Sequence, residues 1–492
     1  MTARTFFLNR DALATTSARR IVLEAAEEAI HAMRPEVLLL EVLPRLQLDT
    51  RAWVLGAGKA VAGMAAAAAT MLGRDHLRGG AVITARGAAA PRRRVGGEPA
   101  VPTKMESGRP RLLVPGSSSP AGASPSAGQL DRAARVGRSS IVVLYGDHPV
   151  PDARSVASTN RLLALADRVG PDEVVLWLIS GGASALLCAP AQGLTLEDKQ
   201  EATRLLVRAG ATIDEINAVR KHLSAVKGGL LGRRLGHAKV ITLALSDVVS
   251  GRLDVIGSGP TVPDDSTYVE ALGVTRRYGL GDRMPAAVME RLELGAAGLM
   301  PETPKRDDPC FTNAVTEVVG SPARAATAAG EAARKLAGPS AHVEVLPDQL
   351  TTEVRVLATS LGAIYRYWSR ERGRPQVVVA AGEPTVRVTG DGKGGRCQEL
   401  AAALIPEIEG LAGCAVACVA TDGQDFIPGA GGALVDGETA AQARSHGLRV
   451  QDYLRRNDTN ALHRRLGTLV QSRPTGTNVC DLVVAALNCN PA

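Results

Sequence analysis

The chain has 492 residues, 45% of them hydrophobic and 22% charged, which indicates two or three folded domains and excludes a wholly disordered protein. Its formal charge of +7 resides in one segment, since residues 86–138 hold ten Arg or Lys against three Asp or Glu and the remainder is neutral. Aromatic residues make up only 3%, too few for base-stacking surfaces, so we do not expect a nucleic-acid-binding protein.

The first half alternates apolar, strand-like runs with helical patterns, and most runs end in a glycine-rich or polar turn. Strands are expected at 53–55, 173–179 and 239–245. This rhythm predicts an α/β fold with mostly parallel sheets. Ligands of such sheets bind at the carboxyl ends of strands, where these turns lie.

Residues 87–140 interrupt that rhythm. They contain PRRR and a Ser-, Gly- and Pro-rich stretch, and no part of them can bury an apolar face. We predict a disordered surface insertion, and a functional basic tether stays open.

The second half repeats the α/β pattern. Strands are expected at 314–319, 376–380 and 414–419, and a helix at 321–336. Gly, Pro and charge cluster at 285–308. We therefore predict two α/β/α, Rossmann-like domains, residues 1–300 and 301–492, with an active-site cleft between them.

The first turn carries Gly56, Gly58 and Lys59. It is not a dinucleotide fingerprint, because Val61 stands where the third glycine belongs, and it is not a Walker A loop. A glycine turn at a helix start with a lysine favours a phosphate or carboxylate. A plain strand–helix turn is the alternative.

Later turns of the first half carry further donors and one carboxylate. Residues 180–184 form a glycine nest without the GxSxG spacing of a nucleophilic serine. Asp247 follows a strand and could hold magnesium, orient a hydroxyl or cap a turn. The candidate substrate or nucleotide contacts in these turns are Ser180, Gly181, Gly182, Ser184, Asp247, Ser258, Gly259 and Thr261.

A capping box at Thr212–Glu215 starts a helix predicted to run to the glycines at 228–229. Its cations Arg220, Lys221 and Lys227 are either complements of the helix dipole or, for Lys227, a phosphate contact.

Three polar turns follow strands in the second half. Gly394, Gly395 and Arg396 open a helix in a glycine loop that also holds a lysine, a pattern typical of a polyanion site. The remaining candidates are Glu383, Asp422, Thr475, Thr477 and Asn478. Each could serve turn chemistry alone.

Taken together, these segments resemble the glycerate 2-kinase family of class II, the MOFRL-type glycerate kinases. The matching stretches are GAGKA (56–60), DHPVPD (147–152), ISGGASALL (179–187), GATIDEINAVRKHLSAVKGG (210–229), SDVVSGRLDVIGSGPTVPD (246–264), GEPTV (382–386), GKGGRCQEL (392–400), TDGQD (421–425) and PTGTNVCDL (474–482). They occur in the family's order over nearly the whole chain.

The resemblance implies that the protein converts ATP and D-glycerate to ADP and 2-phospho-D-glycerate, with Mg²⁺ as cofactor. It places the catalytic residues at Lys59, Glu383, Arg396, Asp422 and Asn478. Asp247, Glu383 or Asp422 could hold the metal. The chain departs from the family pattern at Ala183, residues 250–252, Cys397, residues 426–428 and Arg473.

Two alternatives stay open: a hydroxypyruvate reductase, which the altered fingerprint at Val61 disfavours, and a non-catalytic sugar-acid-binding homologue. The seven cysteines show no CxxC spacing, so we expect a reducing compartment and neither zinc site nor disulfide framework. Without an apolar run of membrane-spanning length, no membrane association is expected. A cytoplasmic location is predicted; a mitochondrial one and a homo-oligomer remain open.

Overall fold

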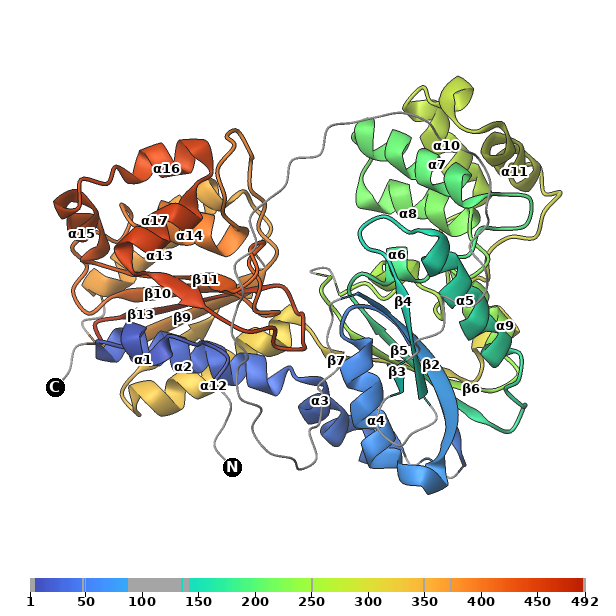
Figure 1. Ribbon diagram of the computed structural model, residues 1–492, viewed down its shortest axis with the longest axis horizontal. Helices are drawn as coiled ribbons and strands as arrows, with labels where there is room; N and C mark the ends of the chain where they lie inside the picture. Colours follow the sequence, from blue (N-terminus) through green and yellow to red (C-terminus); the bar gives the residue numbers. More distant parts are fainter. Residues whose placement is uncertain are drawn as a thin grey trace, which may run out of the picture.

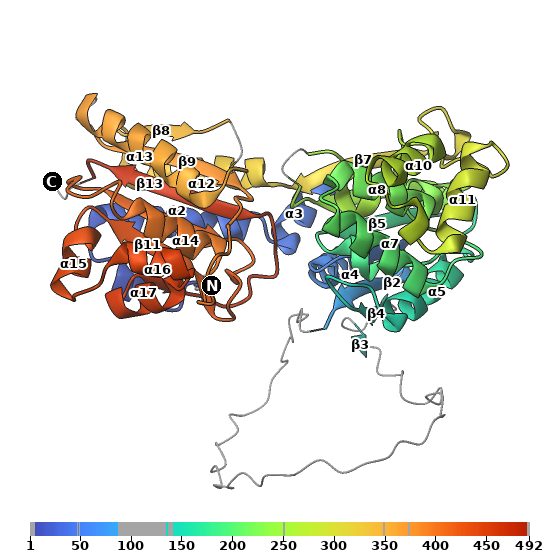
Figure 2. The same cartoon turned by 90° about the horizontal axis from the view of Figure 1, so that it is seen from above.

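The computed structural model describes residues 5–46, 48, 50–86, 134–135, 141–248, 251–347, 350–371 and 374–489 (Figure 1). These residues form two β-sheets, each covered by helices and lying side by side (Figures 1 and 2). The α/β fold class is therefore confirmed. The predicted insertion at 87–140 lies outside the described residues except for 134–135. Within the described part of the chain, no helix is both long and apolar enough to cross a membrane.

The first sheet has seven strands in the order β3-β4-β2-β1-β5-β6-β7. Every neighbouring pair is parallel except β3 and β4, so the mostly parallel prediction holds here. The strands are β1 (Ala52–Ala57), β2 (Leu77–Ala85), β3 (Ala134–Arg135), β4 (Ile141–Gly146), β5 (Val174–Ser180), β6 (Lys239–Leu245) and β7 (Ala314–Gly320). The three strands expected in the first half correspond to β1, β5 and β6.

Helices cover both faces of this sheet, which explains its continuous apolar strands. Val54 of β1 belongs to the core beneath α3 (Pro35–Val42) and α4 (Val61–His76), and its neighbour Leu55 faces α5 (Ala153–Ala166), α6 (Ala183–Leu186) and α9 (Leu230–Leu235). A separate apolar cluster joins the four remaining helices, which Figure 1 shows above the sheet. They are α7 (Leu196–Arg208), α8 (Ile213–His222), α10 (Tyr268–Arg277) and α11 (Ala286–Ala296).

Helix α8 begins at the predicted capping box but ends earlier than predicted. The Thr212 side chain accepts the amide of Glu215, as the box requires. The helix stops at His222 because the Ser224 hydroxyl accepts the amides of Val226 and Lys227 and turns the chain. Lys227 therefore lies outside the helix.

The second sheet has six strands in the order β12-β11-β10-β13-β9-β8. Only β8 and β9 run parallel, so the prediction of mostly parallel strands holds for the first sheet and not for this one. Its strands are β8 (His342–Val345), β9 (Gln376–Gly382), β10 (Ala415–Ala420), β11 (Ala430–Asp436), β12 (Leu469–Gln471) and β13 (Asp481–Leu487). A continuous apolar strand indicates that both of its faces are buried, which is typical of parallel sheets. Here helices bury both faces of a sheet whose strands are mostly antiparallel.

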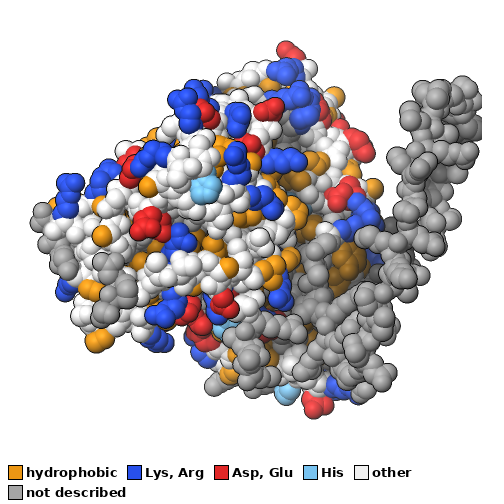
Figure 3. All heavy atoms as spheres, turned by 60° about the vertical axis from the view of Figure 1, so that its left-hand side comes forward, with side chains coloured by type: hydrophobic (Ala, Val, Ile, Leu, Met, Phe, Trp, Pro, Cys, Tyr) orange, Lys and Arg blue, Asp and Glu red, His pale blue; other side chains and the backbone are white. Residues whose placement is uncertain are grey.

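Helices from both ends of the chain cover the second sheet. One face is covered by α1 (Arg10–Leu13), α2 (Ser17–Ala32) and α12 (Pro322–Ala337), which Figure 1 shows as blue and yellow helices beneath the orange and red sheet. The other face packs against α13 (Val354–Glu371), α14 (Arg396–Leu404), α15 (Thr439–Ser445), α16 (Val450–Arg456) and α17 (Thr459–Leu466). Figure 3 shows Lys and Arg side chains spread among Asp and Glu over this side of the molecule.

The predicted division at residue 300 differs from sheet membership in two segments. The helices α1 and α2 precede the first sheet in sequence but pack on the second. Strand β7 lies beyond residue 300 but pairs with β6 in the first sheet. The pattern of an amphipathic segment indicates that one face is apolar, but it does not indicate which sheet that face packs against.

Candidate functional site

The turn after β1 is held against the turn after β5. The amide of Lys59 donates to the carbonyl of Gly181 at 2.8 Å, and the amide of Ala60 donates to Ser180 Oγ at 3.0 Å. Gly58 has φ +144, and a Cβ there would lie 2.2 Å from Ser180 Oγ, so this close approach requires glycine. The exposed Lys59 side chain then lies over Gly182, where a Cβ would be 3.1 Å from Lys59 Cγ.

Asp247 follows β6 and lies against the same β5 turn. A Cβ on Gly181 would be 1.9 Å from Asp247 Oδ2, so the glycine admits the carboxylate. Burial and the negative charge of Glu383 raise the pKa of Asp247 to about 6, against the opposing charges of Lys59 and Arg396. The charged groups that act on Asp247 are thus Lys59 of the first sheet and Glu383 and Arg396 of the second.

The second sheet places an arginine between two carboxylates. Arg396 starts α14, and its guanidinium binds Glu383 on one side and Asp481 on the other, with Nε 2.9 Å from Asp481 Oδ2. Burial alone would lower the pKa of Arg396, but these two carboxylates raise it, so the guanidinium stays charged. Burial raises the pKa of Asp481 to about 7 although Arg396 opposes the shift.

Asp422 follows β10 and accepts the amide of Gln424 on Oδ1 at 2.8 Å. Burial raises its pKa, while that hydrogen bond and the charges of Lys59 and Arg396 act in the opposite sense. Asn478 is half-buried in the loop before β13, with no hydrogen bond to any residue that the structure describes.

Strand register explains why the second-sheet residues gather at one edge. Asp481 is paired with Gly382 of β9 and with Ala420 of β10, in antiparallel register. The end of β9, the end of β10 and the start of β13 therefore coincide. The Cys480 thiol, next to Asp481, donates to the carbonyl of Asp247 at 2.8 Å and so joins this edge to the turns of the first sheet.

Several other residues predicted to contact a substrate already form hydrogen bonds within the protein. Lys227 is 2% exposed, and its ammonium donates to the carbonyl of Ser184 at 2.9 Å. Lys227 thus serves neither as a dipole complement of α8 nor, in this arrangement, as a free phosphate contact. Ser184 Oγ lies 3.1 Å from Ser258 Oγ, and the Thr475 and Thr477 hydroxyls bind backbone carbonyls at 2.6 Å.

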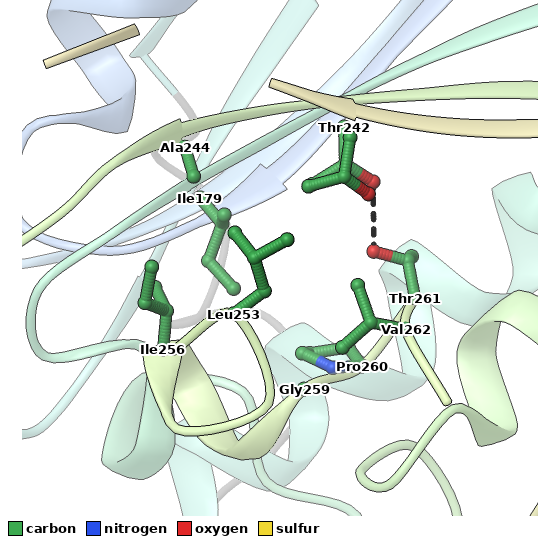
Figure 4. Close-up of a pocket in the computed structure, with 10 residues that line it drawn as sticks. Ile179, Thr242, Ala244, Leu253, Ile256, Gly259, Pro260, Thr261 and Val262 are labelled. Carbon is green, nitrogen blue, oxygen red and sulfur yellow. Dashed lines mark hydrogen bonds between the residues drawn. The ribbon is translucent and has the colours of Figure 1, made fainter. Parts of the chain in front are cut away.

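Thr261 and Gly259 line a small cavity of the first domain. Figure 4 shows Thr261 directed at Thr242, with the two Oγ1 atoms 2.8 Å apart, beside the apolar side chains of Leu253 and Ile256. The cavity that these residues line has a volume of about 10 Å³, roughly the space of one water molecule. It is too small to hold either predicted substrate.

The start of α14, predicted to bind a polyanion, already holds a carboxylate. Asp425 Oδ1 accepts the amide of Cys397 at 3.1 Å, and Oδ2 accepts the amide of Gln398 at 2.8 Å. A Cβ on Gly395 would lie 2.3 Å from Asp425 Cγ, so the glycine makes room for this cap. Asp425 therefore occupies two amides of the first helical turn, and the phosphate site that the sequence predicts in this glycine loop stays a prediction.

Asp425 and Asp481 were not among the predicted site residues. Both are 2–3% exposed, and buried carboxylates are rare unless they are paired. Asp481 starts the otherwise apolar run of β13, and that single charge is a signal which the sequence contained. Within the described ranges, no group of three or more His, Cys, Asp or Glu side chains is arranged to hold a metal ion.

Comparisons with known proteins agree over nearly the whole chain. Residues 21–293 match a family described as a domain of unknown function, DUF4147, and residues 376–481 match the MOFRL family. The D-glycerate 2-kinase of Thermotoga maritima is 33% identical over 474 residues, which cover 96% of this chain and 99% of that protein. The human glycerate kinase is 32% identical over 480 residues, covering 88% and 84%.

Solved structures give the same relationship. The crystal structure of the glycerate kinase from Thermotoga maritima superimposes with a TM-score of 0.78 at 31% identity, covering 95% of this chain and 99% of that one. A protein from Pyrococcus horikoshii superimposes with a TM-score of 0.74 at 30% identity, covering 95% and 98%. Both similarities extend over both sheets.

Proposed function

Since this chain belongs to the glycerate kinase family, we propose that it transfers the γ-phosphoryl group of ATP to the 2-hydroxyl of D-glycerate, forming 2-phospho-D-glycerate. The observation that carries this proposal is the contact between the two sheets at Asp247, whose carbonyl accepts the Cys480 thiol at 2.8 Å. Cys480 precedes Asp481, the partner of Arg396, and its own carbonyl accepts the amide of Thr421, next to Asp422. Phosphoryl transfer depends mainly on positioning and charge neutralisation. A site assembled from two sheets supplies both cations and carboxylates.

Lys59 and Arg396 neutralise the charge of the transferred phosphoryl group. Lys59 is exposed at a helix start, and no ion pair engages it among the described residues. Arg396 is fixed by Glu383 and Asp481, so its remaining N–H donors are held in a defined direction. Preorganised cations of this kind act without reorganisation during the reaction.

Asp422 orients the attacking 2-hydroxyl and accepts its proton. The Gln424 amide binds Oδ1 and holds the carboxylate, which leaves Oδ2 to the substrate. Burial raises the pKa of Asp422, and a more basic carboxylate is a better proton acceptor. Asn478, close by in sequence to Asp481, is assigned to substrate positioning.

The acidic residues Asp247 and Glu383 fit a magnesium ion. Burial and the negative charge of Glu383 raise the pKa of Asp247 to about 6, and a divalent cation held by these carboxylates would offset that repulsion. Magnesium is usually bound by one or two carboxylates together with the substrate phosphates. The metal, when bound, would supply charge neutralisation at the phosphates.

The glycine turns around these side chains complete the assignment. Gly58, Gly181 and Gly182 let the turns after β1, β5 and β6 approach one another, and we assign them, with Gly56 and Ser180, to contacts with substrate or nucleotide. We place the reaction in the cytoplasm, as the sequence predicted.

A coupled assay for ADP release with D-glycerate and ATP tests this function, and phosphorus NMR identifies the product isomer. We expect ADP release that depends on D-glycerate, with phosphate on carbon 2. Oxidation of NAD(P)H by hydroxypyruvate, without ADP release, would instead indicate a reductase. Binding of D-glycerate without either reaction would indicate a non-catalytic homologue.

A further inference from the structure

Arg220, on the last turn of α8, is half-buried and lacks an acidic partner. No ion pair to Arg220 occurs among the residues that the structure describes. Its Nε atom donates to Thr203 Oγ1 of α7 at 3.4 Å, a long contact with a neutral group. Burial lowers the pKa of Arg220, the opposite of what a neighbouring carboxylate would do.

Two buried lysines add to this positive charge. Lys199 and Lys227 are 7% and 2% exposed, and their ammonium groups donate to the carbonyls of Leu223 and Ser184. Burial, together with the neighbouring cations, lowers the pKa of Lys199 to about 8 and that of Lys227 to about 7. The titratable groups that act on them are Cys188 and other cations, with no carboxylate. Buried charge without a counter-ion is costly.

A chain of contacts leads from this cluster to the turn that carries Lys59. Asn217 lies one turn before Arg220 on α8, and its Oδ1 accepts the Ser258 hydroxyl at 3.2 Å. Ser258 Oγ is in turn 3.1 Å from Ser184 Oγ. Ser184 comes two residues after Gly182, the residue over which the Lys59 side chain lies.

A second chain of contacts reaches the same turn through α7. Gln200, one turn before Thr203, donates to the carbonyl of Pro151 at 2.7 Å. His148 of that loop lies against Gly182, where a Cβ would be 3.1 Å from His148 Cδ2. The helix that carries Arg220 and the helix that carries its partner Thr203 are therefore both linked to the turn at which we place the reaction.

We propose that Arg220 binds an anionic group of a substrate, a carboxylate or a phosphate, next to the 180–184 turn. The proposal rests on the function proposed above, in which both substrates are anions. A guanidinium offers a planar pair of donors that matches either group. The carboxylate of D-glycerate and the phosphates of ATP are the two sources, and the bound anion would supply the counter-charge that the cluster lacks.

The test is Arg220→Gln, with Arg208→Gln as the matched control because Arg208 is an exposed arginine at the end of α7. Calorimetry measures the binding of D-glycerate and of ATP separately, and thermal unfolding is recorded for the same preparations. We expect Arg220→Gln to bind one of the two anions 10- to 100-fold more weakly, while the control binds both as the parent does. The weakened ligand identifies the source of the anion.

Thermal unfolding separates this role from a structural one. Removal of an uncompensated buried charge should leave the melting temperature unchanged or raise it, since functional sites carry such destabilising charges. Unchanged binding of both anions overturns the proposal, whatever the melting temperature. Should Arg220→Gln fail to fold, Arg220→Lys keeps the charge but loses the paired donors, and parental affinity for both anions in that variant also overturns it.

The binding measurements keep this proposal distinct from the kinase assignment. A parent protein that releases no ADP would refute the proposed reaction. Weaker binding of D-glycerate or ATP to Arg220→Gln would still support the anion site. Conversely, parental binding by the variant alongside normal ADP release refutes only the role of Arg220.

Discussion

Replacing Asp425 by alanine tests whether the start of α14 is capped by the protein or reserved for a ligand. The Asp425 carboxylate is 3% exposed and accepts the amides of Cys397 and Gln398 as well as the Gln398 side-chain amide, at 2.8–3.1 Å. Asp425→Ala leaves these three donors buried without that acceptor. We therefore expect a loss of stability with little direct effect on nucleotide binding.

The contacts set the size of the effect. Loss of a helix cap typically costs about 1 kcal/mol, and a buried donor left unsatisfied costs about 1–3 kcal/mol. The Gln398 side-chain amide keeps the carbonyl of residue 425 at 3.1 Å, so the two backbone amides account for roughly 2–6 kcal/mol of unfolding free energy. For a domain of about 200 residues, each kcal/mol shifts the melting temperature by about 2–4 °C, so a decrease of roughly 10 °C is expected.

Differential scanning fluorimetry and calorimetric ATP titration on the same preparation provide the assay. Asp391→Ala is the control, because Asp391 is an exposed carboxylate of the same glycine loop, and it should melt like the parent. A capping role for Asp425 is refuted if Asp425→Ala keeps the parental melting temperature while its ATP affinity changes several-fold. That result would mean that the helix amides are available to a phosphate.

Four further substitutions test the reaction centre. Lys59→Ala should keep its melting temperature and lose on the order of 10²-fold in turnover, as expected for a lost transition-state donor; unchanged turnover would make it a plain turn residue. Asp422→Asn should fold and bind both substrates with turnover lowered on the order of 10²-fold; a lowered melting temperature with parental turnover would make Asp422 structural. Asp481→Asn should release Arg396 and lower kcat on the order of 10²-fold with smaller changes in KM, and a change confined to KM would contradict this positioning role. The pKa of Asp247 is raised to about 6 in the folded state, which therefore favours the protonated carboxyl; the stability present below pH 3.8 is lost as the pH rises through 6. Asp247→Asn should therefore melt above the parent at pH 8 and at the same temperature as the parent near pH 4. Equal melting temperatures at pH 8 would contradict the raised pKa.

The local pattern of the sequence determined most of the secondary structure and the position of the strand-end turns that carry the candidate site residues. The apolar run at 239–245 coincides with β6, and the run at 173–179 lies within one residue of β5. The capping box at Thr212–Glu215 starts α8 as predicted. The periodicity of buried residues and the capping of helices depend on residues close together in the chain, so they can be predicted from one sequence.

The direction of the second sheet came from tertiary structure alone. Its strands are buried on both faces, as parallel strands usually are, because helices from both ends of the chain cover it. Only the antiparallel entry of β13 brings Asp481 to the edge where β9 and β10 end. Strand order and direction depend on contacts between distant segments, which a periodic pattern does not report.

Tertiary structure also decided which polar groups remain available to a ligand. A glycine loop at a helix start and a buried lysine both indicated anion contacts, yet Asp425 caps the helix and Lys227 binds a carbonyl. Arg220, which the sequence offered only as a dipole complement, is left without a carboxylate among the described residues. The residue types specify what chemistry is possible at each position, whereas the pairing of donors with acceptors across the folded chain determines which of them a substrate can reach.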